Sequence, residues 1–387
     1  MRSARSPLAQ VTAADARFMA RALELAARGL GRTFPNPPVG AVLVRGGRVV
    51  GEGFHSRAGA PHAEIEALRA AGGAARGATL YVTLEPCTHH GRTPPCVDAL
   101  LRVKPRRAVV AMPDPNPRVR GRGLKQLRRA GIPVLVGPGG SEARLLCEGY
   151  RTRLLRGRPL VTLKLAATLD GRIAAAGGDS RWITGPASRR LAHALRDISD
   201  AVLVGAGTVR ADDPLLTCRL PGGRDPVRIV VAGPRLALPT SARVLAPGGP
   251  PTWIIAPLGA PAARVDRLRR RGVEVLLLPG RRGRVPFASL VRMLGARGLT
   301  SLLIEGGATV AAEALRARVV DRLVLFVAPA VLGGDGVAAV RSLGLRRVGE
   351  ALRVEGLAVG RVADDLVLEG RLRYPRPATR RAGVKPG

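Results

Sequence analysis

Hydrophobic and polar positions follow two different periods along the chain, which predict helices and strands in alternation. Between residues 11 and 30 apolar residues recur every three or four positions, the spacing of an amphipathic helix. Prolines at 35, 37 and 38 end that pattern, and a strand hairpin turning at Gly46–Gly47 follows. Beyond it we expect strands at 80–84, 108–112 and 132–136, and helices at 62–72, 94–101 and 123–130. This alternation predicts an α/β sandwich.

A glycine-rich break at 137–140 and the segment Gly157–Pro159 divide the chain, with residues 142–156 helical between them. The pattern then starts again with a strand at 160–166. Further strands are expected at 201–204, 227–231, 252–256, 273–278, 301–304 and 322–328, and helices at 186–198, 262–271, 286–297 and 308–318. Residues 352–373 read as two extended pieces that pair antiparallel. We therefore expect domains at residues 1–150 and 158–375, and a disordered basic tail at 376–387.

Composition narrows the class of protein. The 387 residues contain no apolar run long enough to cross a bilayer, and the N-terminus lacks the apolar core of a signal peptide. Four cysteines do not make a disulfide framework in a chain of this length. We expect a cytoplasmic protein with no membrane partner, whose cysteines need individual explanations.

The net charge of +35 admits two interpretations. A basic face can bind nucleic acid. However, only four of the 63 basic residues are lysines, the arginines are scattered, and aromatics make up 3% of the chain, too few for a base-stacking platform. We favour a compositional bias toward arginine, with an anionic small molecule and no nucleic acid as the partner.

Histidine and cysteine gather in the first half in a pattern typical of a metal site. His62 is followed by Glu64, and Cys87 and Cys96 each follow a proline. Zinc binds Cys and His, and a catalytic site keeps one position open for water, whose pKa it lowers toward about 7. Glu64 then carries the proton of that water to the substrate. The zinc nucleobase deaminases share H-x-E and P-C-x-x-C motifs, although here eight residues separate the cysteines.

Two further expectations concern this group. Both cysteines are expected to open helices, whose N-termini favour the thiolate. His89 or His90 would give a closed, structural zinc site if either were a fourth ligand, but that interpretation leaves Glu64 without a role.

Residues 35–123 resemble the deaminase half of the bifunctional riboflavin biosynthesis deaminase/reductases. The motifs are PNPPVGAVLV (35–44), GEGFHSRAGAPHAEIEAL (51–68), YVTLEPCTHHGRTPPC (81–96) and PDPNPRVRGRG (113–123). The resemblance implies a zinc cytidine-deaminase-like α/β/α sandwich. It implies that His62, Cys87 and Cys96 bind Zn2+, that Glu64 shuttles protons, and that Asn36 and His55 contact substrate. His89, His90, Asp114 and Asn116 would line the neighbourhood.

The second half has only weak cofactor signals of its own. Gly205–Gly207 is as consistent with a tight turn as with a dinucleotide loop. Glu305–Thr309, between a strand and a helix, can cradle phosphate or be an ordinary turn.

The resemblance extends through this half, in KLAATLDGRIA (164–174), SRWITG (180–185), GAGTVRADDPLLTCR (205–219) and LIEGGATV (303–310). It implies a dihydrofolate-reductase-like α/β domain that uses NADPH. The implied cofactor contacts are Ala166, Trp182, Thr208, Asp212, Gly233, Gly307, Ala308, Thr309 and Val310. The implied substrate contacts are Ser180, Arg196, Leu216, Arg219 and Glu305. Arg196 and Arg219 would grip a 5′-phosphate.

The sequence therefore predicts a bifunctional enzyme, a zinc aminohydrolase and an NADP-dependent oxidoreductase. It would deaminate 2,5-diamino-6-ribosylamino-4(3H)-pyrimidinone 5′-phosphate and reduce the ribosyl chain, giving 5-amino-6-(5-phosphoribitylamino)uracil. The family suggests a homo-oligomer. The alternatives are an RNA adenosine or cytidine deaminase with an appended domain, and a nucleic-acid binder without enzymatic activity.

Overall fold

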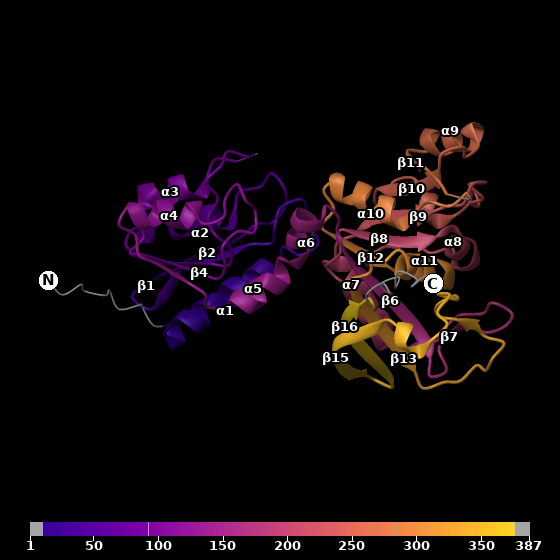
Figure 1. Cartoon of the computed structure of the whole chain (residues 1–387). Coiled ribbons are helices and arrows are strands. Elements are labelled where there is room, and N and C mark those ends of the chain that lie inside the picture. The colour runs from indigo at the N-terminus through magenta and orange to yellow at the C-terminus, as the bar shows by residue number, and fades with distance from the viewer. Residues whose placement is uncertain (1–10, 92, 282, 376–387) are drawn as a thin grey trace, which may run out of the picture. The chain divides into compact units, whose positions relative to one another are not determined.

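The computed structural model of the chain describes residues 11–91, 93–281 and 283–375 (Figure 1). The basic tail expected at 376–387 lies outside the described residues. The chain divides into two compact units. The first comprises Met1–Leu160 with Asp197–Asp200 and Arg292–Ser301, and the second comprises Val161–Arg196, Ala201–Val291 and Leu302–Gly387.

The first unit is built on a five-stranded sheet in the order β2-β1-β3-β4-β5. Its strands are β1 (Gly40–Arg45), β2 (Arg48–Phe54), β3 (Thr79–Val82), β4 (Arg107–Val110) and β5 (Val134–Val136). Its helices are α1 (Ala13–Ala27), α2 (Ala63–Ala71), α3 (Cys96–Val103), α4 (Arg122–Arg129), α5 (Gly140–Leu146) and α6 (Glu148–Arg156). Strands β3, β4 and β5 run parallel, whereas β1 pairs antiparallel with both of its neighbours.

Alternation along β1 places helices on both faces of this sheet. Ala41 and Leu43 pack in a core with α2, α3 and α4, whereas Val42 and Val44 pack in a second core with α1 and α5. Figure 1 shows these two helical layers on either side of the strands. Because successive strand side chains point to opposite faces, the apolar run of β1 fills both layers.

Helix α1 begins at a capping box, in which Thr12 and Asp15 each accept the other's backbone N–H at 3.1 Å. The segment expected as one helix at 142–156 is two helices instead, α5 and α6, with the break at Cys147.

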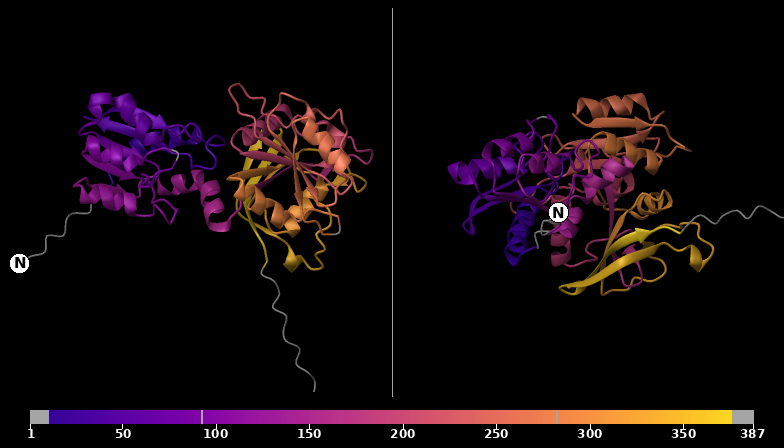
Figure 2. Two further views of the ribbon diagram at one scale, coloured as in Figure 1. Left: turned by 90° about the horizontal axis from the view of Figure 1, so that it is seen from above. Right: turned by 60° about the vertical axis from the view of Figure 1, so that its left-hand side comes forward.

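The second unit contains a nine-stranded sheet in the order β11-β10-β9-β8-β12-β6-β13-β16-β15. Its strands are β6 (Leu160–Thr168), β8 (Ala201–Gly205), β9 (Val227–Val231), β10 (Thr252–Pro257), β11 (Glu274–Leu278), β12 (Ser301–Ile304), β13 (Arg322–Ala328), β15 (Arg353–Val362) and β16 (Asp365–Arg373). Its helices are α7 (Pro186–Asp197), α8 (Ala206–Asp212), α9 (Ala262–Arg270), α10 (Phe287–Ala296) and α11 (Ala308–Arg316). The predicted antiparallel pairing at 352–373 is confirmed as the β15–β16 hairpin, yellow in Figure 2.

Short elements account for what the periodicity did not predict. Helix α8 follows β8 directly, so Gly205–Gly207 is a strand–helix junction rather than a tight turn. Strands β7 (Arg172–Ala174) and β14 (Val337–Ala338) form a separate two-stranded sheet. Within the described ranges, no helix has both the length and the apolar character that crossing a bilayer requires.

Candidate functional site

His62, Cys87 and Cys96 converge in the first unit, where their ligand atoms all lie within 4.8 Å of one another. Nδ1 of His62 lies 3.5 Å from the sulfur of Cys87 and 3.3 Å from that of Cys96. The three residues come from separate places, because His62 caps the N-terminus of α2, Cys96 begins α3 and Cys87 lies in the loop before α3. One imidazole and two thiols match the donors that zinc prefers. Neither His89 nor His90 belongs to this group, which argues against the closed site.

The prediction that both cysteines open helices is wrong for Cys87. Its loop instead covers the N-terminus of α3. The Cys96 N–H donates to the sulfur of Cys87 at 3.3 Å, and the Val97 N–H donates to the Cys87 carbonyl oxygen at 3.2 Å. Hydrogen bonding from Cys96, and then from His62, lowers the pKa of the Cys87 thiol. The thiolate is therefore favoured on Cys87, which is not part of the helix, whereas the neighbouring Cys87 sulfur and burial raise the pKa of Cys96, which begins α3.

Glu64 lies in the first turn of α2 and is 3% exposed. Burial, and after it the nearby Cys87 thiolate, raise the pKa of its carboxyl to about 7, while His62 opposes the shift. A carboxyl group with a pKa near neutrality can both accept and release a proton at physiological pH. Its position next to His62 places that capacity beside the candidate metal ligands.

A cavity of about 240 Å³ opens beside this group. The sequence-predicted residues that line it are Asn36, His55, His62, Glu64, Cys87, His89, Asp114 and Asn116. Cys96 and His90 are not among its lining residues. Nδ2 of Asn36 lies 3.0 Å from Nε2 of His55, and Nδ1 of His55 lies 3.1 Å from the Pro61 carbonyl oxygen. Because a carbonyl only accepts, Nδ1 of His55 carries the proton and Nε2 accepts from Asn36. This fixes the orientation of both side chains in the cavity wall.

Glu85 also lines this cavity, although no sequence motif assigned it a role. It is 3% exposed and its carboxylate accepts four backbone N–H groups. Those of Gly123 and Leu124 donate to Oε1 at 2.9 and 3.3 Å, and those of Asp114 and Gly121 donate to Oε2 at 3.1 and 2.9 Å. Glu85 therefore holds the whole 114–124 segment against the site. The sequence features that could have identified Glu85 are its position directly before Pro86–Cys87 and the glycines of the 114–124 segment. Nothing in the sequence, however, indicates that this carboxylate contacts that segment.

Asp114 is buried on that segment and accepts hydrogen bonds from the Asn116 N–H at 2.8 Å and the Tyr150 hydroxyl at 3.3 Å. Burial raises the pKa of its carboxyl to about 6, against the effect of these hydrogen bonds.

The second unit contains a cavity of about 1220 Å³ at the carboxyl ends of β8, β9 and β12. Seven of the nine residues predicted to contact a cofactor line it, namely Thr208, Asp212, Gly233, Gly307, Ala308, Thr309 and Val310. Ala166 and Trp182 do not, and Trp182 is 68% exposed with the Arg189 guanidinium stacked 4.4 Å from its ring centroid. Ser180 lines the cavity and donates to Asp212 at 3.3 Å. Four arginines complete a wall suited to an anionic ligand, Arg210, Arg235, Arg284 and Arg341.

The Gly306–Gly307 loop shapes the wall at α11. Gly306 has φ +99°, a conformation that favours glycine, and Gly307 caps α11 and donates its N–H to the Thr208 hydroxyl at 3.1 Å. A Cβ on Gly205 would lie 2.8 Å from Val310, so glycine permits β8 and α11 to approach closely. The N-terminus of α11 thus faces the cavity with the polarity that attracts phosphate.

The other predicted substrate contacts form a group apart from the lining of this cavity. Arg196 makes two hydrogen bonds to Glu305, at 2.5 and 2.8 Å, and a third to the Thr217 carbonyl at 2.9 Å. Burial raises the pKa of Glu305, but Arg196 and Lys164 outweigh it and hold that pKa below its usual value. Arg219 is exposed, and its backbone N–H donates to Nδ1 of His193 at 3.2 Å. Leu216 is 1% exposed within the core, so its side chain offers no surface to a ligand here.

Comparison with known proteins covers both units. The family model described as the cytidine and deoxycytidylate deaminase zinc-binding region matches residues 12–112, and that of the RibD C-terminal domain matches residues 159–368. The riboflavin biosynthesis protein RibD of Aquifex aeolicus is 45% identical over 355 residues, covering 92% of this chain and 97% of that protein. RibD of Escherichia coli is 43% identical over 367 residues, covering 92% and 98%.

Solved structures agree with this likeness. A structure of Acinetobacter baumannii RibD superposes with a TM-score of 0.84 at 39% identity and covers 93% of this chain and 99% of that chain. The Thermotoga maritima diaminohydroxyphosphoribosylaminopyrimidine deaminase/5-amino-6-(5-phosphoribosylamino)uracil reductase gives a TM-score of 0.82 at 38% identity, with the same coverage.

Proposed function

The chain belongs to the RibD family of riboflavin biosynthesis proteins. We propose that its first cavity carries out the deamination and its second cavity the reduction. The protein is a bifunctional enzyme, a zinc-dependent deaminase and an NADPH-dependent reductase, and its α/β fold is the one predicted. The RNA deaminase alternative is wrong, because the relatives that span both halves are RibD proteins. The single observation that carries the assignment of the first cavity is that His62, Cys87, Cys96 and Glu64 meet beside it.

In the first cavity, His62, Cys87 and Cys96 are the proposed zinc ligands. Zinc held by these residues would supply a nucleophilic water at neutral pH, because it would lower the pKa of that water toward about 7. Glu64 accepts the proton of that water and delivers it to the pyrimidine ring and the departing amine, which leaves as ammonia. Asn36 and His55, fixed by their mutual hydrogen bond, orient the ring. The net reaction replaces an exocyclic amine by oxygen and consumes one water.

In the second cavity, the Thr208 and Gly307–Val310 region and the loop at Gly233 are proposed to hold NADPH. NADPH bound there would supply a hydride to the ribosyl group, and the residues that line the cavity would position the cofactor. The arginines that line the cavity compensate the negative charge of the cofactor. Ala166 and Trp182 stay predictions that the cavity lining does not support.

The substrate of this step is a phosphorylated pyrimidine, and Ser180, Arg196, Arg219 and Glu305 are proposed to contact it. Because Glu305 holds Arg196 with two hydrogen bonds, that guanidinium is fixed before any substrate binds. A role for Leu216 would require local movement. The domain limits 1–150 and 158–375, the homo-oligomer and the cytoplasmic location stay predictions.

The assignment is tested by a two-part turnover assay on zinc-replete enzyme with the diaminopyrimidinone ribosyl phosphate. We expect ammonia release without cofactor, followed by NADPH oxidation once NADPH is added. Glu64→Gln should abolish ammonia release yet leave reduction of the pre-made deaminated intermediate intact. Survival of deamination in that variant would show that Glu64 is not the proton carrier. Ammonia release without NADPH oxidation in the wild type would show that the second cavity is misassigned.

A further inference from the structure

The two-stranded sheet of β7 and β14 forms part of the wall of the large cavity in the second unit. Strand β7 and the segment after it contribute Ile173, Ala174, Gly178 and Ser180 to the lining, and β14 and the segment after it contribute Val337 and Arg341. We call residues 172–180 and 337–341 the flap. It lies outside the nine-stranded sheet, so that sheet's ladder does not hold it.

Apolar burial contributes little to holding the flap. Its two strands pair over only two residue pairs, with a register shift between them. At its base the large apolar side chains Leu169, Val331 and Leu332 are 61%, 70% and 40% exposed. Because hydrophobic stabilisation follows the apolar area removed from water, these residues add little, and so short a ladder is marginal alone.

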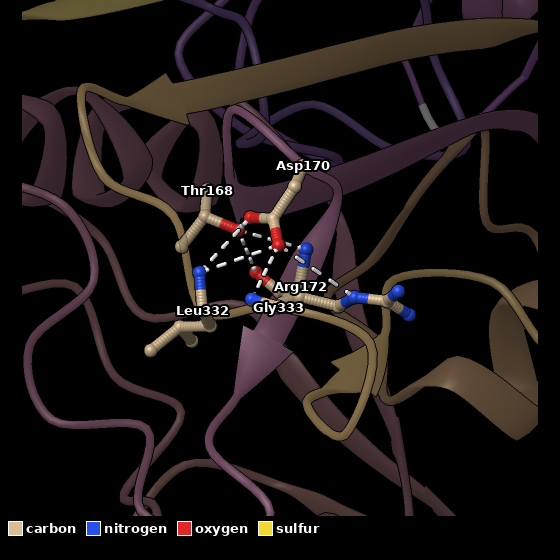
Figure 3. Close-up of polar contacts among 5 residues, drawn as sticks. All are labelled: Thr168, Asp170, Arg172, Leu332 and Gly333. Carbon is tan, nitrogen blue, oxygen red and sulfur yellow. Dashed lines mark hydrogen bonds and ion pairs between the residues drawn. The ribbon is translucent and has the colours of Figure 1, made fainter.

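A polar cluster around Asp170 connects the two chain segments that lead into the flap (Figure 3). The carboxylate accepts the Gly333 N–H at 2.7 Å and the Leu332 N–H at 3.2 Å, both from the segment before β14. It also accepts the Thr168 hydroxyl at 2.5 Å, and the same hydroxyl oxygen accepts the Arg172 N–H at 2.9 Å at the start of β7.

Two backbone hydrogen bonds run beside this cluster, from the Leu169 N–H to Ala330 and from the Ala339 N–H to Gly171, both at 2.9 Å. The charged acceptor is nevertheless the only group drawn in Figure 3 that bonds both segments through its side chain. Hydrogen bonds from backbone N–H groups to a carboxylate are stronger than those between neutral groups. The Thr168 hydroxyl and these N–H groups hold the pKa of Asp170 below its usual value, consistent with an ionised acceptor.

We propose that Asp170 is a positioning residue for cofactor binding, whose carboxylate clasps the two chain segments that lead into the flap and so sets the wall against which NADPH binds. This inference rests on the proposed assignment of the cavity to NADPH. Asp170 does not line the cavity itself, so its effect passes through the flap.

The test is Asp170→Asn in the full-length, zinc-replete enzyme. The amide keeps the size of the side chain but turns one acceptor oxygen into a donor facing N–H and O–H donors. We expect KM for NADPH to rise about tenfold while kcat stays within about twofold, the pattern of lost binding rather than lost chemistry. Thr168→Val, which removes only the supporting hydroxyl, should shift KM in the same direction by less. Ammonia release by the first unit reports folding of the same chain and should not change.

Two controls separate the possible failures. Asp364→Asn makes the same change on an exposed side chain of the β15–β16 turn, 4.0 Å from Arg361, and should leave KM unchanged. A Cβ on Gly233 meets no atom within 4 Å, so Gly233→Val should fill part of the cavity and raise KM for NADPH. If Gly233→Val has no effect, the cavity assignment fails and the inference fails with it. If Gly233→Val raises KM but Asp170→Asn does not, or if Asp170→Asn lowers kcat alone, the clasp is refuted and the cavity assignment stands.

Discussion

Replacing Glu85 by glutamine should destabilise the first unit through unsatisfied backbone groups. Each carboxylate oxygen accepts two N–H groups, Gly123 and Leu124 on one and Asp114 and Gly121 on the other. Whichever oxygen becomes the amide nitrogen, two N–H donors then face a donor. The side chain is 3% exposed, so water cannot readily replace the lost acceptor. At about 1–3 kcal/mol for each buried unsatisfied group, the cost is about 2–6 kcal/mol.

The assay is unfolding in urea. The extent of unfolding is measured as the loss of ammonia-releasing activity after incubation at each urea concentration. With a slope of about 2 kcal/mol per molar urea, a loss of about 3 kcal/mol lowers the midpoint by about 1.5 M. NADPH oxidation by the same samples serves as the internal reference, because Glu85 lies in the first unit and the large cavity lies in the second. Deamination in native buffer should also fall, since the 114–124 segment carries Asp114 and Asn116 into the cavity.

The matched control is Glu24→Gln, the same substitution in the same unit at an exposed ion pair with Arg21. Such a pair contributes about 0–1 kcal/mol, so its midpoint should move by less than about 0.5 M. Equal shifts in the two variants, or no shift in Glu85→Gln, would refute the argument that the four N–H groups depend on this carboxylate.

Two further predictions concern the first unit. Removing metal with a chelator should abolish ammonia release while NADPH oxidation of the deaminated intermediate continues, because all three proposed ligands lie in the first unit. Metal analysis should find about one zinc per active chain. Asp15 is buried, yet hydrogen bonds from Thr12 and Tyr81, with Arg107, outweigh that burial and hold its pKa below 3.8. Its stabilisation is therefore complete above about pH 4 and lost as pH falls through the lower folded pKa, so Asp15→Asn should lower the urea midpoint at neutral pH and the gap should shrink in acid. A gap that widened in acid would contradict this sign.

Most helices and strands could be predicted from the sequence because the residues that determine them lie within a few positions of one another. The apolar runs at 227–231, 301–304 and 322–328 correspond to β9, β12 and β13 with the same bounds. Apolar period, prolines and caps act within a few residues, so the order of helices and strands follows from the pattern. The candidate metal site could be predicted for a different reason. The combination of residue types and their order at His62, Glu64, Cys87 and Cys96 is typical of zinc deaminases.

Elements without a period of their own were missed. Strand β14 has two residues and β7 has three, too few for alternation to appear, and they exist because each pairs with the other. Helix α8 begins in a glycine-containing segment of low intrinsic helix propensity, and the close approach of β8 and α11 decides its place.

The class of fold, the order of its elements and the donor set of the candidate metal site thus follow from the sequence. Which distant groups pair follows only from the three-dimensional arrangement of those elements. Glu85 meets backbone N–H groups up to 39 positions away, Arg196 meets Glu305 at a separation of 109, and Asp170 meets Gly333 at 163. Sheet order and loop closure bring these partners together, and a single side chain's identity does not specify which backbone donors will surround it. Residues that act by positioning others, such as Glu85, could therefore not be identified from the sequence, because their role depends on which distant groups they contact.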